Sequence, residues 1–429
     1  MMTANNYTLT QRIDTAKESP LFYKIFALVG AGMMLDAADV YMASTINSSI
    51  IATHFATLNQ GSTFLSVGFL GLFIGSIITG YLGDFFGRRA TYHWNLLIFS
   101  IATLIGAFSI NIEMLIATRF IAAIGLGAEI VTGYSMISEF APVNKQGKWS
   151  GMIAIIANLG APLGLLLSTI LIGNYGWRSM FIFIGLCAFI LFFCRRNLPE
   201  SPRWLIQHGR KEEAQSIIEK LELKGHYDED QSTNKNAMTI NKGRGLLVAI
   251  TAVSASLLCQ YTFTSWVPTL LAGRGISIIH SMWFATIMMI GAPIGAFIGS
   301  LLIDRLGHKF TIVPAFILTA IAGIAYGFET TAFGTIANGF ILTTLLYILI
   351  ASNVSVYAPE LFATNYRFRG TGFANGIAKL LTTLSPYMVL FIITKYNPTM
   401  IFFIIAGISL FAALIVGFFG PETKQQPIK

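Results

Sequence analysis

Long apolar stretches dominate this sequence and restrict the folds that it can adopt. A helix that crosses the hydrocarbon core of a membrane needs about 20 mostly apolar residues, and many such stretches follow one another along the 429 residues. Charged residues make up only 11% of the chain, against roughly 25% in a typical soluble domain. The sequence therefore predicts an all-α membrane protein with twelve transmembrane helices. The predicted spans are 22–50, 61–82, 92–111, 113–134, 148–172, 177–195, 244–271, 280–303, 309–328, 333–357, 370–394 and 398–420.

Basic residues gather on one side of the predicted spans. The formal net charge is +8, and most of the 28 Lys and Arg fall in the tails and in the connections that follow even-numbered spans. Lys and Arg in short loops mark the cytoplasmic side of a membrane protein, so the charge sets orientation and does not indicate nucleic acid. Both termini are predicted to be cytoplasmic. Short outer connections favour a bacterial cytoplasmic (inner) membrane, where we expect a multi-pass monomer in contact with the lipid bilayer.

Landmarks of the first half recur in the second half at an offset of about 220 residues, and such self-similarity indicates a structural repeat. We predict two pseudo-symmetric six-helix bundles, 1–195 and 244–429. The polar linker 196–243 between them is predicted to contain an amphipathic surface helix. The matching landmarks are Asp84 with Asp304, Glu139 with Glu360, and Pro199-Glu200-Ser201 with Pro421-Glu422-Thr423.

A charged glycine-rich loop, GDFFGRR, connects the second and third predicted spans. Its glycines permit a tight turn, and Asp84 can cap a helix and pair with arginines. Ion pairs of this kind can hold one side of the molecule closed in one state and release it in another; the alternative is a capped polar loop with no such role. The recurrence at Asp304 favours gating. The predicted gating residues are Asp84, Arg88, Arg89, Glu139, Glu200, Arg203, Asp304, Glu360 and Arg369.

Ionisable side chains inside the predicted spans are costly, at roughly 2.5 kcal/mol or more each, and are functional candidates for that reason. The first span carries Asp36 and Asp39, and the fourth carries Arg119 and Glu129. These two spans run in opposite directions, so Asp39 and Arg119 lie at depths that allow contact. Protonation of such a carboxylate frees its arginine and can change the favoured conformation. The alternatives are a permanent salt bridge, Asp36 as the proton carrier, and Glu129 as part of the cytoplasmic network.

The loop motifs resemble those of the major facilitator superfamily. GDFFGRR, PESPRWL after the sixth span, Glu139, Glu360 and the final PET are similar to the branch that contains sugar porters, organic-ion transporters and niacin or aromatic-acid symporters. This resemblance implies the major facilitator fold and transport by alternating access. In proton-coupled sugar porters an aspartate on helix 1 and an arginine on helix 4 are placed similarly to Asp39 and Arg119.

The sequence shows no residue pattern typical of a metal site or of an enzyme active site. Cys187, Cys194 and Cys259 lie in apolar spans at no metal-ligand spacing, and no nucleophile and base set appears. We therefore expect no enzymatic activity, no metal and no cofactor, with the proton as the coupling ion.

Lys379 lies too deep in the eleventh predicted span to reach the surface comfortably. Niacin-like and organic-anion transporters resemble this chain in having a basic residue there. A fixed positive charge near the midplane would attract a substrate carboxylate; the alternative is a lysine that is neutral or paired with an acid. We predict a small-molecule substrate, an organic anion, bound by Lys379.

The seventh span departs from the sugar-porter pattern that it resembles. Gln260 is kept, but Tyr261 stands where a second glutamine is expected. In the fifth span, Asn158 stands where sugar porters carry glutamine. With Tyr41 and Tyr357, these residues complete the predicted substrate site. The sequence thus favours proton-coupled uptake of a small organic acid; the alternatives are proton-coupled sugar uptake, drug or metabolite efflux by proton antiport, and a non-transporting nutrient sensor.

Overall fold

The chain is helical almost throughout the part that the structure describes. In a computed structural model of the protein, the described residues are 18–141, 146–221, 242–362 and 367–423, without the side chains of 80, 146, 147, 242, 304 and 367–369. These residues contain twelve spans that are long and apolar enough to cross a membrane. The predicted fold class and the predicted number of spans are confirmed.

The first six spans pack against one another in a fixed set of pairs. Helix α3 packs along α5, α2 along α6, and α4 along both α5 and α7. The helices extend beyond most of the predicted limits by a few residues. Their bounds are α2 Pro20–Ala52, α3 Leu58–Phe86, α4 Arg88–Ala107, α5 Ile112–Phe140, α6 Gln146–Tyr175 and α7 Trp177–Cys194.

The last six spans repeat this arrangement. Helix α13 packs along α15, α10 along α17, and α14 along α18, which are the pairs expected when the second half copies the first. The bounds are α10 Lys242–Thr264, α11 Val267–Gly273, α12 Ile278–Met289, α13 Gly291–Leu306, α14 His308–Phe328, α15 Ala332–Leu349, the π-helical η4 Ile350–Tyr357, α16 Ala358–Glu360, α17 Arg367–Lys395 and α18 Met400–Phe419.

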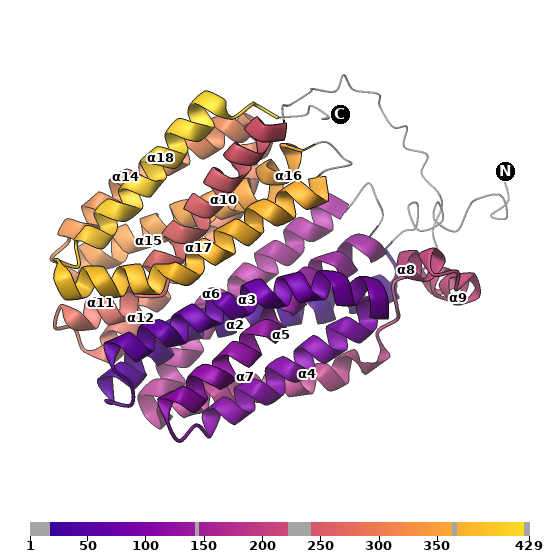
Figure 1. The fold of residues 1–429 in the computed structure, drawn as a ribbon, viewed down its shortest axis with the longest axis horizontal. Coiled ribbons are helices and arrows are strands. Elements are labelled where there is room, and N and C mark those ends of the chain that lie inside the picture. The colour runs from indigo at the N-terminus through magenta and orange to yellow at the C-terminus, as the bar shows by residue number, and fades with distance from the viewer. Residues whose placement is uncertain (1–17, 142–145, 222–241, 363–366, 424–429) are drawn as a thin grey trace.

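Figure 1 shows the two sets of helices as two bundles, one coloured indigo to magenta and the other red to yellow. They meet where α3 contacts α17 and where α6 contacts α12. Between them in sequence lie η3 Arg195–Asn197, α8 Pro202–Gln207 and α9 Lys211–Leu221. We call the end that carries α8 and α9 the linker end, and the opposite end, where α2 ends and α3 begins, the far end. The domain limits at residues 195 and 244 remain a proposal.

Matched glycines allow close helix contact in both bundles. A Cβ atom at Gly75 of α3 would collide with the Ile124 carbonyl of α5, and one at Gly295 of α13 would collide with the Thr344 carbonyl of α15. The two glycines are 220 residues apart, which is the offset of the predicted repeat. Small residues at such crossings let helix backbones approach closely inside a membrane.

Two of the predicted spans are not continuous helices. The span predicted at 244–271 breaks between α10 and α11, and the span predicted at 280–303 breaks at Ile290 between α12 and α13. Proline has no backbone N–H, so Pro268 and Pro293 cannot bond the carbonyls four residues earlier. The carbonyls left without this bond belong to Thr264 and Met289, where the preceding helices end.

Candidate functional site

Asp39 of α2 and Arg119 of α5 form a buried ion pair inside the first bundle. Arg119 Nη1 lies 2.5 Å from Asp39 Oδ2, and the two side chains are 4% and 0% exposed. The contact expected from the opposite directions of the two helices is therefore present. A Cβ atom at Gly68 of α3 would lie 3.3 Å from Arg119 Nε, so a small residue makes room for the guanidinium. Neutralising either group would leave the other buried without its counter-ion, which costs free energy.

Arg195 and Glu129 form a second buried pair, which sequence reasoning missed. The Arg195 side chain is 0% exposed, and its Nη1 lies 2.6 Å from Glu129 Oε1. It also donates to the Leu28 carbonyl at 3.0 Å and lies over the Tyr92 ring. Glu129 thus belongs to the bundle interior and not to the surface network, which corrects that alternative. The feature of the sequence that could have indicated this pair is the position of Arg195 directly after an apolar span.

Asp36 lies on the same helix as Asp39 and is 1% exposed. Neither of its carboxylate oxygens has a hydrogen-bond partner among the described residues. It lies within electrostatic range of Glu129, Arg195 and Asp39. Asp36 therefore lies near the Glu129–Arg195 pair, which the sequence did not indicate.

Lys379 occupies the middle of α17, on the face that meets the other bundle. Gly376, three residues earlier, approaches Phe73 of α3, and the carbonyl of Thr383, four residues later, accepts a hydrogen bond from Ser66 of α3. Residues three and four apart share a helix face, so Lys379 belongs to this interface. Its side chain is half-buried, and within the described part of the chain no acidic side chain pairs with its ammonium group.

Three polar side chains meet between the bundles at the middle of the molecule. Gln260 of α10 donates to the hydroxyl of Tyr41 on α2 and, at 3.2 Å, to that of Tyr347 on α15. Tyr347 also donates to Tyr41. Beside them, the ring of Tyr261 packs against that of Phe69 across the interface, with centroids 4.7 Å apart. Sequence reasoning found all of these hydroxyl and amide groups except Tyr347.

Tyr357, also predicted for the substrate site, lies apart from this cluster. Its side chain is 0% exposed, its hydroxyl donates to the Pro421 carbonyl at 2.9 Å, and its ring stacks on His308. Tyr347 lies on the same span but ten residues earlier, at the depth of Gln260. Asn158 of α6 is half-buried, and its amide makes no side-chain hydrogen bond among the described residues.

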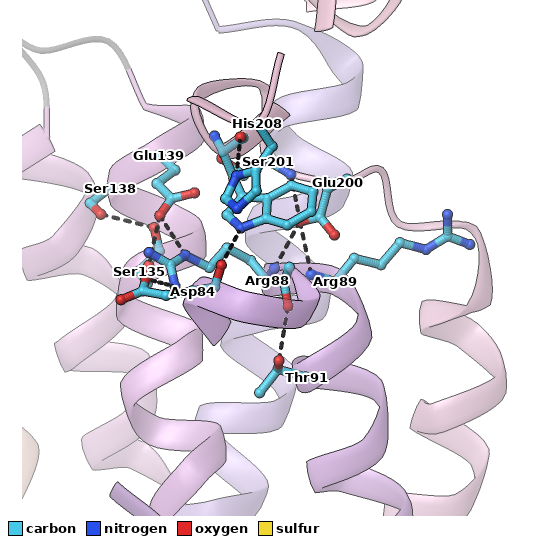
Figure 2. A network of polar contacts seen from close by, with 12 residues as sticks. Asp84, Arg88, Arg89, Thr91, Ser135, Ser138, Glu139, Glu200, Ser201 and His208 are labelled. Atoms are coloured by element: carbon cyan, nitrogen blue, oxygen red, sulfur yellow. Dashed lines mark hydrogen bonds and ion pairs between the residues drawn. The ribbon is translucent and has the colours of Figure 1, made fainter. Parts of the chain in front are cut away.

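Hydrogen bonds between the bundles, within the described ranges, lie in the middle and at the far end. Besides the Tyr41 cluster, they join Ser48 to Thr269 at 2.8 Å, Thr169 to Thr286 at 3.2 Å, Tyr387 to Thr63 at 3.2 Å, and Ser66 to the Thr383 carbonyl. The linker-end contacts drawn in Figure 2 join helices of the first bundle to one another and to the linker, and none of the drawn contacts reaches the second bundle. Hydrogen bonds thus join the two bundles at the far end.

Cross-linking Ser48→Cys to Thr269→Cys is expected to lock this arrangement. In a background with Cys187, Cys194 and Cys259 replaced by alanine, an oxidant should join the two new thiols, because the hydroxyls that they replace are 2.8 Å apart. Transport should fall to background on oxidation and return on reduction. Each single-cysteine variant is the control. Full transport by the cross-linked protein would contradict a role for this contact in opening.

Figure 2 shows the linker-end network of the first bundle. Arg88 pairs with Asp84 at 2.7 Å and with Glu139 at 3.0 Å, so it joins α3, α4 and α5. Glu200 accepts the backbone N–H groups of Arg88 at 2.9 Å and Arg89 at 3.0 Å. The side chain of Arg89 reaches the Arg196 carbonyl at 2.9 Å. Arg203, the remaining predicted gating residue of this half, is half-buried in the first turn of α8.

The second bundle repeats this network with His308 and Lys309 in the places of Arg88 and Arg89. Glu422 accepts the backbone N–H groups of His308 and Lys309 at 2.9 and 3.0 Å, as Glu200 does for α4. His308 takes the place of Arg88, with Nε2 lying 3.3 Å from Glu360. The sequence repeat IDRLGHK contained this histidine, but its role was not recognised. The side chains of the predicted residues Asp304 and Arg369 lie outside the described residues.

Replacing Glu200 with alanine is expected to destabilise the first bundle. Glu200 satisfies two N–H groups at the start of α4, and loss of a helix cap costs about 0.5–2 kcal/mol. The midpoint of thermal unfolding of the purified protein should fall by a few degrees. Glu212→Ala, at an exposed position of α9, is the matched control and should leave the midpoint unchanged. Equal midpoints for Glu200→Ala and wild type would show that the cap contributes nothing.

The repeated bundles, with ionised side chains enclosed between their helices, define a multi-pass membrane transporter built from two parallel repeats. The chain belongs to the major facilitator superfamily: residues 21–429 match the family described as "Sugar (and other) transporter". It is a transporter and not an enzyme, as predicted.

Two relatives and one solved structure illustrate the similarity. The chain is 30% identical to the inner membrane metabolite transport protein YdjE of Escherichia coli, over 96% of each chain. It is 26% identical to the niacin transporter NiaP of Acinetobacter baylyi, over 98% of this chain and 99% of the relative. The inward open conformation of the xylose transporter XylE from E. coli has a TM-score of 0.74 at 19% identity, covering 95% of this chain and 98% of that one. The fold is therefore shared with XylE.

Proposed function

We propose that the protein imports a small carboxylic acid together with protons by alternating access. The observation that carries this proposal is Lys379, a half-buried cation on the face of α17 that meets the other bundle. Within the described residues it has no acidic partner, whereas Arg119 and Arg195 each have one. A cation kept without a counter-ion at such a depth is suited to pair with an anionic substrate.

The neighbouring groups support a substrate with both a charge and an uncharged polar part. Tyr41, Gln260 and Tyr347 offer hydroxyl and amide groups between the bundles, and the Tyr261 and Phe69 rings offer apolar surface. The relative NiaP is named as a niacin transporter, and niacin is an aromatic carboxylic acid. We take this class, a carboxylate on a small ring, as the first to test.

Asp39 is the proposed proton carrier, with Arg119 as its partner. When Asp39 is ionised, its contact with Arg119 is an ion pair with a hydrogen bond of 2.5 Å. Protonation would neutralise the carboxyl and weaken its hold on Arg119, so α2 and α5 would lose the interaction that joins them at this depth. One proton moving with one monovalent anion is electroneutral. A gradient of one pH unit would then support about tenfold accumulation, which corresponds to about 1.4 kcal/mol.

Orientation and location complete the proposal. We place the linker end in the cytoplasm, because the basic residues gather there, and the membrane is the bacterial inner membrane, as named for the relative YdjE. The protein would act as a monomer without a cofactor. The far-end contacts between the bundles would then close the outer side, with the cytoplasmic side as the route of release.

Uptake by proteoliposomes tests this function. Vesicles with the purified protein are given labelled nicotinate or xylose under an inward proton gradient, with and without a protonophore. We expect accumulation of nicotinate that the protonophore abolishes. If xylose alone accumulates, the substrate is a sugar and not an acid. If the protein exports the probe under the same gradient, it is an antiporter and not an importer. If neither probe is accumulated, exported or exchanged, the result favours a non-transporting sensor.

Sugar uptake is the second candidate, and Gln260 favours it. This residue, retained from the sugar-porter pattern, lies between Tyr41 and Tyr347, in a cluster that can bind hydroxyl groups. The family description also names sugar. The same uptake experiment separates the two candidates, because only the acid requires a cationic residue at position 379.

A further inference from the structure

The first bundle encloses more acidic than basic groups. Asp39 pairs with Arg119, and Glu129 pairs with Arg195. Asp36 is left over, 1% exposed, with both carboxylate oxygens lacking a hydrogen-bond partner within the described ranges. The second oxygen of Glu129 has no partner among the same residues. Three carboxyl groups and two guanidinium groups are thus buried within the first bundle.

The charge balance requires a further positive charge. If all three carboxyl groups were ionised, the buried set would carry one uncompensated negative charge. An isolated carboxylate in such surroundings is so costly that it takes up a proton instead. Gly32, one helical turn before Asp36 on α2, approaches both Arg195 and Glu129, so the two carboxylates and one arginine lie along the same face of α2.

We propose that Asp36 and Glu129 form a proton-binding site that holds one shared proton, with Arg195 as the counter-ion, in addition to the Asp39–Arg119 pair. Binding forms one O–H bond at a carboxylate oxygen and breaks none in the protein. The ligand is a proton, delivered by water and returned to water. The site neither requires a particular substrate nor depends on the direction of transport.

The groups around Asp36 on each neighbouring helix support this assignment. Glu129 comes from α5, Arg195 from the end of α7, and Tyr92 from α4, where it stacks on the guanidinium. On its own helix α2 the nearest titratable group is Asp39, paired with Arg119. The described side chains of the other packed helices, α3 and α6, include only one charged residue each, and both lie at the linker end. These residues are Asp84 and Lys148.

Arg195 connects this site to the linker-end network. The next residue, Arg196, accepts a hydrogen bond from Arg89 through its carbonyl, and Glu200 caps the start of α4. Arg195 also donates to the Leu28 carbonyl of α2. A Cβ atom at Gly32 would collide with the guanidinium, so the group is enclosed against the backbone of α2. A proton at Glu129 would weaken the contact that holds the start of the linker in place.

Infrared spectroscopy of the purified full-length protein in lipid at pH 7 tests the proposal without a substrate. We expect a carbonyl band of a protonated carboxylic acid that shifts in D₂O. Asp36→Asn should abolish the band, because it removes one carboxyl and leaves a balanced Glu129–Arg195 pair. Glu129→Gln should abolish it too, because Arg195 then pairs with an ionised Asp36. Glu113→Gln, at an exposed position of α5, is the control and should leave the band unchanged.

For Arg195→Gln we expect the opposite change in the carbonyl band. Without the counter-ion both carboxyl groups should be protonated, so the band should increase about twofold. Absence of the band from the wild type, or its survival in either Asp36→Asn or Glu129→Gln, would overturn the shared site. Thermal unfolding confirms that each variant is folded. If the uptake experiment fails but the band is present, only the proposed transport function is rejected, and the proton-binding site is retained.

Discussion

Replacing Asp39 with asparagine is expected to abolish uphill accumulation of the substrate while exchange across the membrane continues. Asparagine has nearly the shape of the protonated aspartate but cannot bind or release a proton. The Arg119 guanidinium, now 2.5 Å from the Asp39 carboxylate, would lose its ion pair in every step of the cycle. Accumulation under a gradient of one pH unit should fall from about tenfold to none.

Counterflow exchange provides the measurement that separates coupling from folding. Labelled nicotinate outside is exchanged for unlabelled nicotinate inside, without a proton gradient, for both Asp39→Asn and wild type. Glu113→Gln serves as the control, since it removes an exposed carboxylate from the same helix as Arg119. Full gradient-driven accumulation by Asp39→Asn would reject Asp39 as the coupling residue and leave a permanent salt bridge that serves stability.

Replacing Lys379 with methionine is expected to weaken binding of a carboxylate by about ten- to a hundredfold. A hydrogen bond to a charged group contributes about 1.5–3 kcal/mol, and about 1.4 kcal/mol corresponds to a factor of ten. Methionine keeps the length of the side chain and removes only the charge. Lys379→Arg should retain most of the affinity, because its charge and reach are similar.

Titration of the purified variants with nicotinate and with xylose checks this expectation. Lys148→Met is the matched control, because Lys148 is exposed near the linker-end start of α6 and has no place between the bundles. The effect should be confined to the acid, since a neutral sugar gains nothing from the ammonium group. Equal affinity of Lys379→Met and wild type for nicotinate would exclude Lys379 from the anion site.

The sequence predicted the pairing of Asp39 with Arg119 because that contact depends on depth alone. Two antiparallel spans place residues at matching heights, and the small residue Gly68 leaves space for the longer side chain. Tyr41, Gln260 and Tyr261 were found for a similar reason, as polar groups at the middle of spans. Tyr347, and not Tyr357, contacts Gln260; both tyrosines lie on one span, and only the packing shows which of them Gln260 reaches.

Arg195 could not be placed from the sequence. It directly follows an apolar span and precedes a polar linker, which is where arginines usually face water. In the structure its side chain turns back to Glu129 and the Leu28 carbonyl, because Gly32 leaves the room for it. The lack of a partner for Asp36 follows from this contact, since Glu129 already occupies the guanidinium.

The amino-acid sequence by itself determined the twelve spans, their division into two repeats and the set of charges that must lie inside the membrane. It could do so because lipid excludes polar backbone and charge, so composition along the chain reports what is buried. Only the tertiary structure decided that Arg195 pairs with Glu129, where prolines divide the spans, and which tyrosines meet at the interface. Those outcomes depend on the rotation of each helix and on the space that neighbouring glycines leave, which no local pattern records.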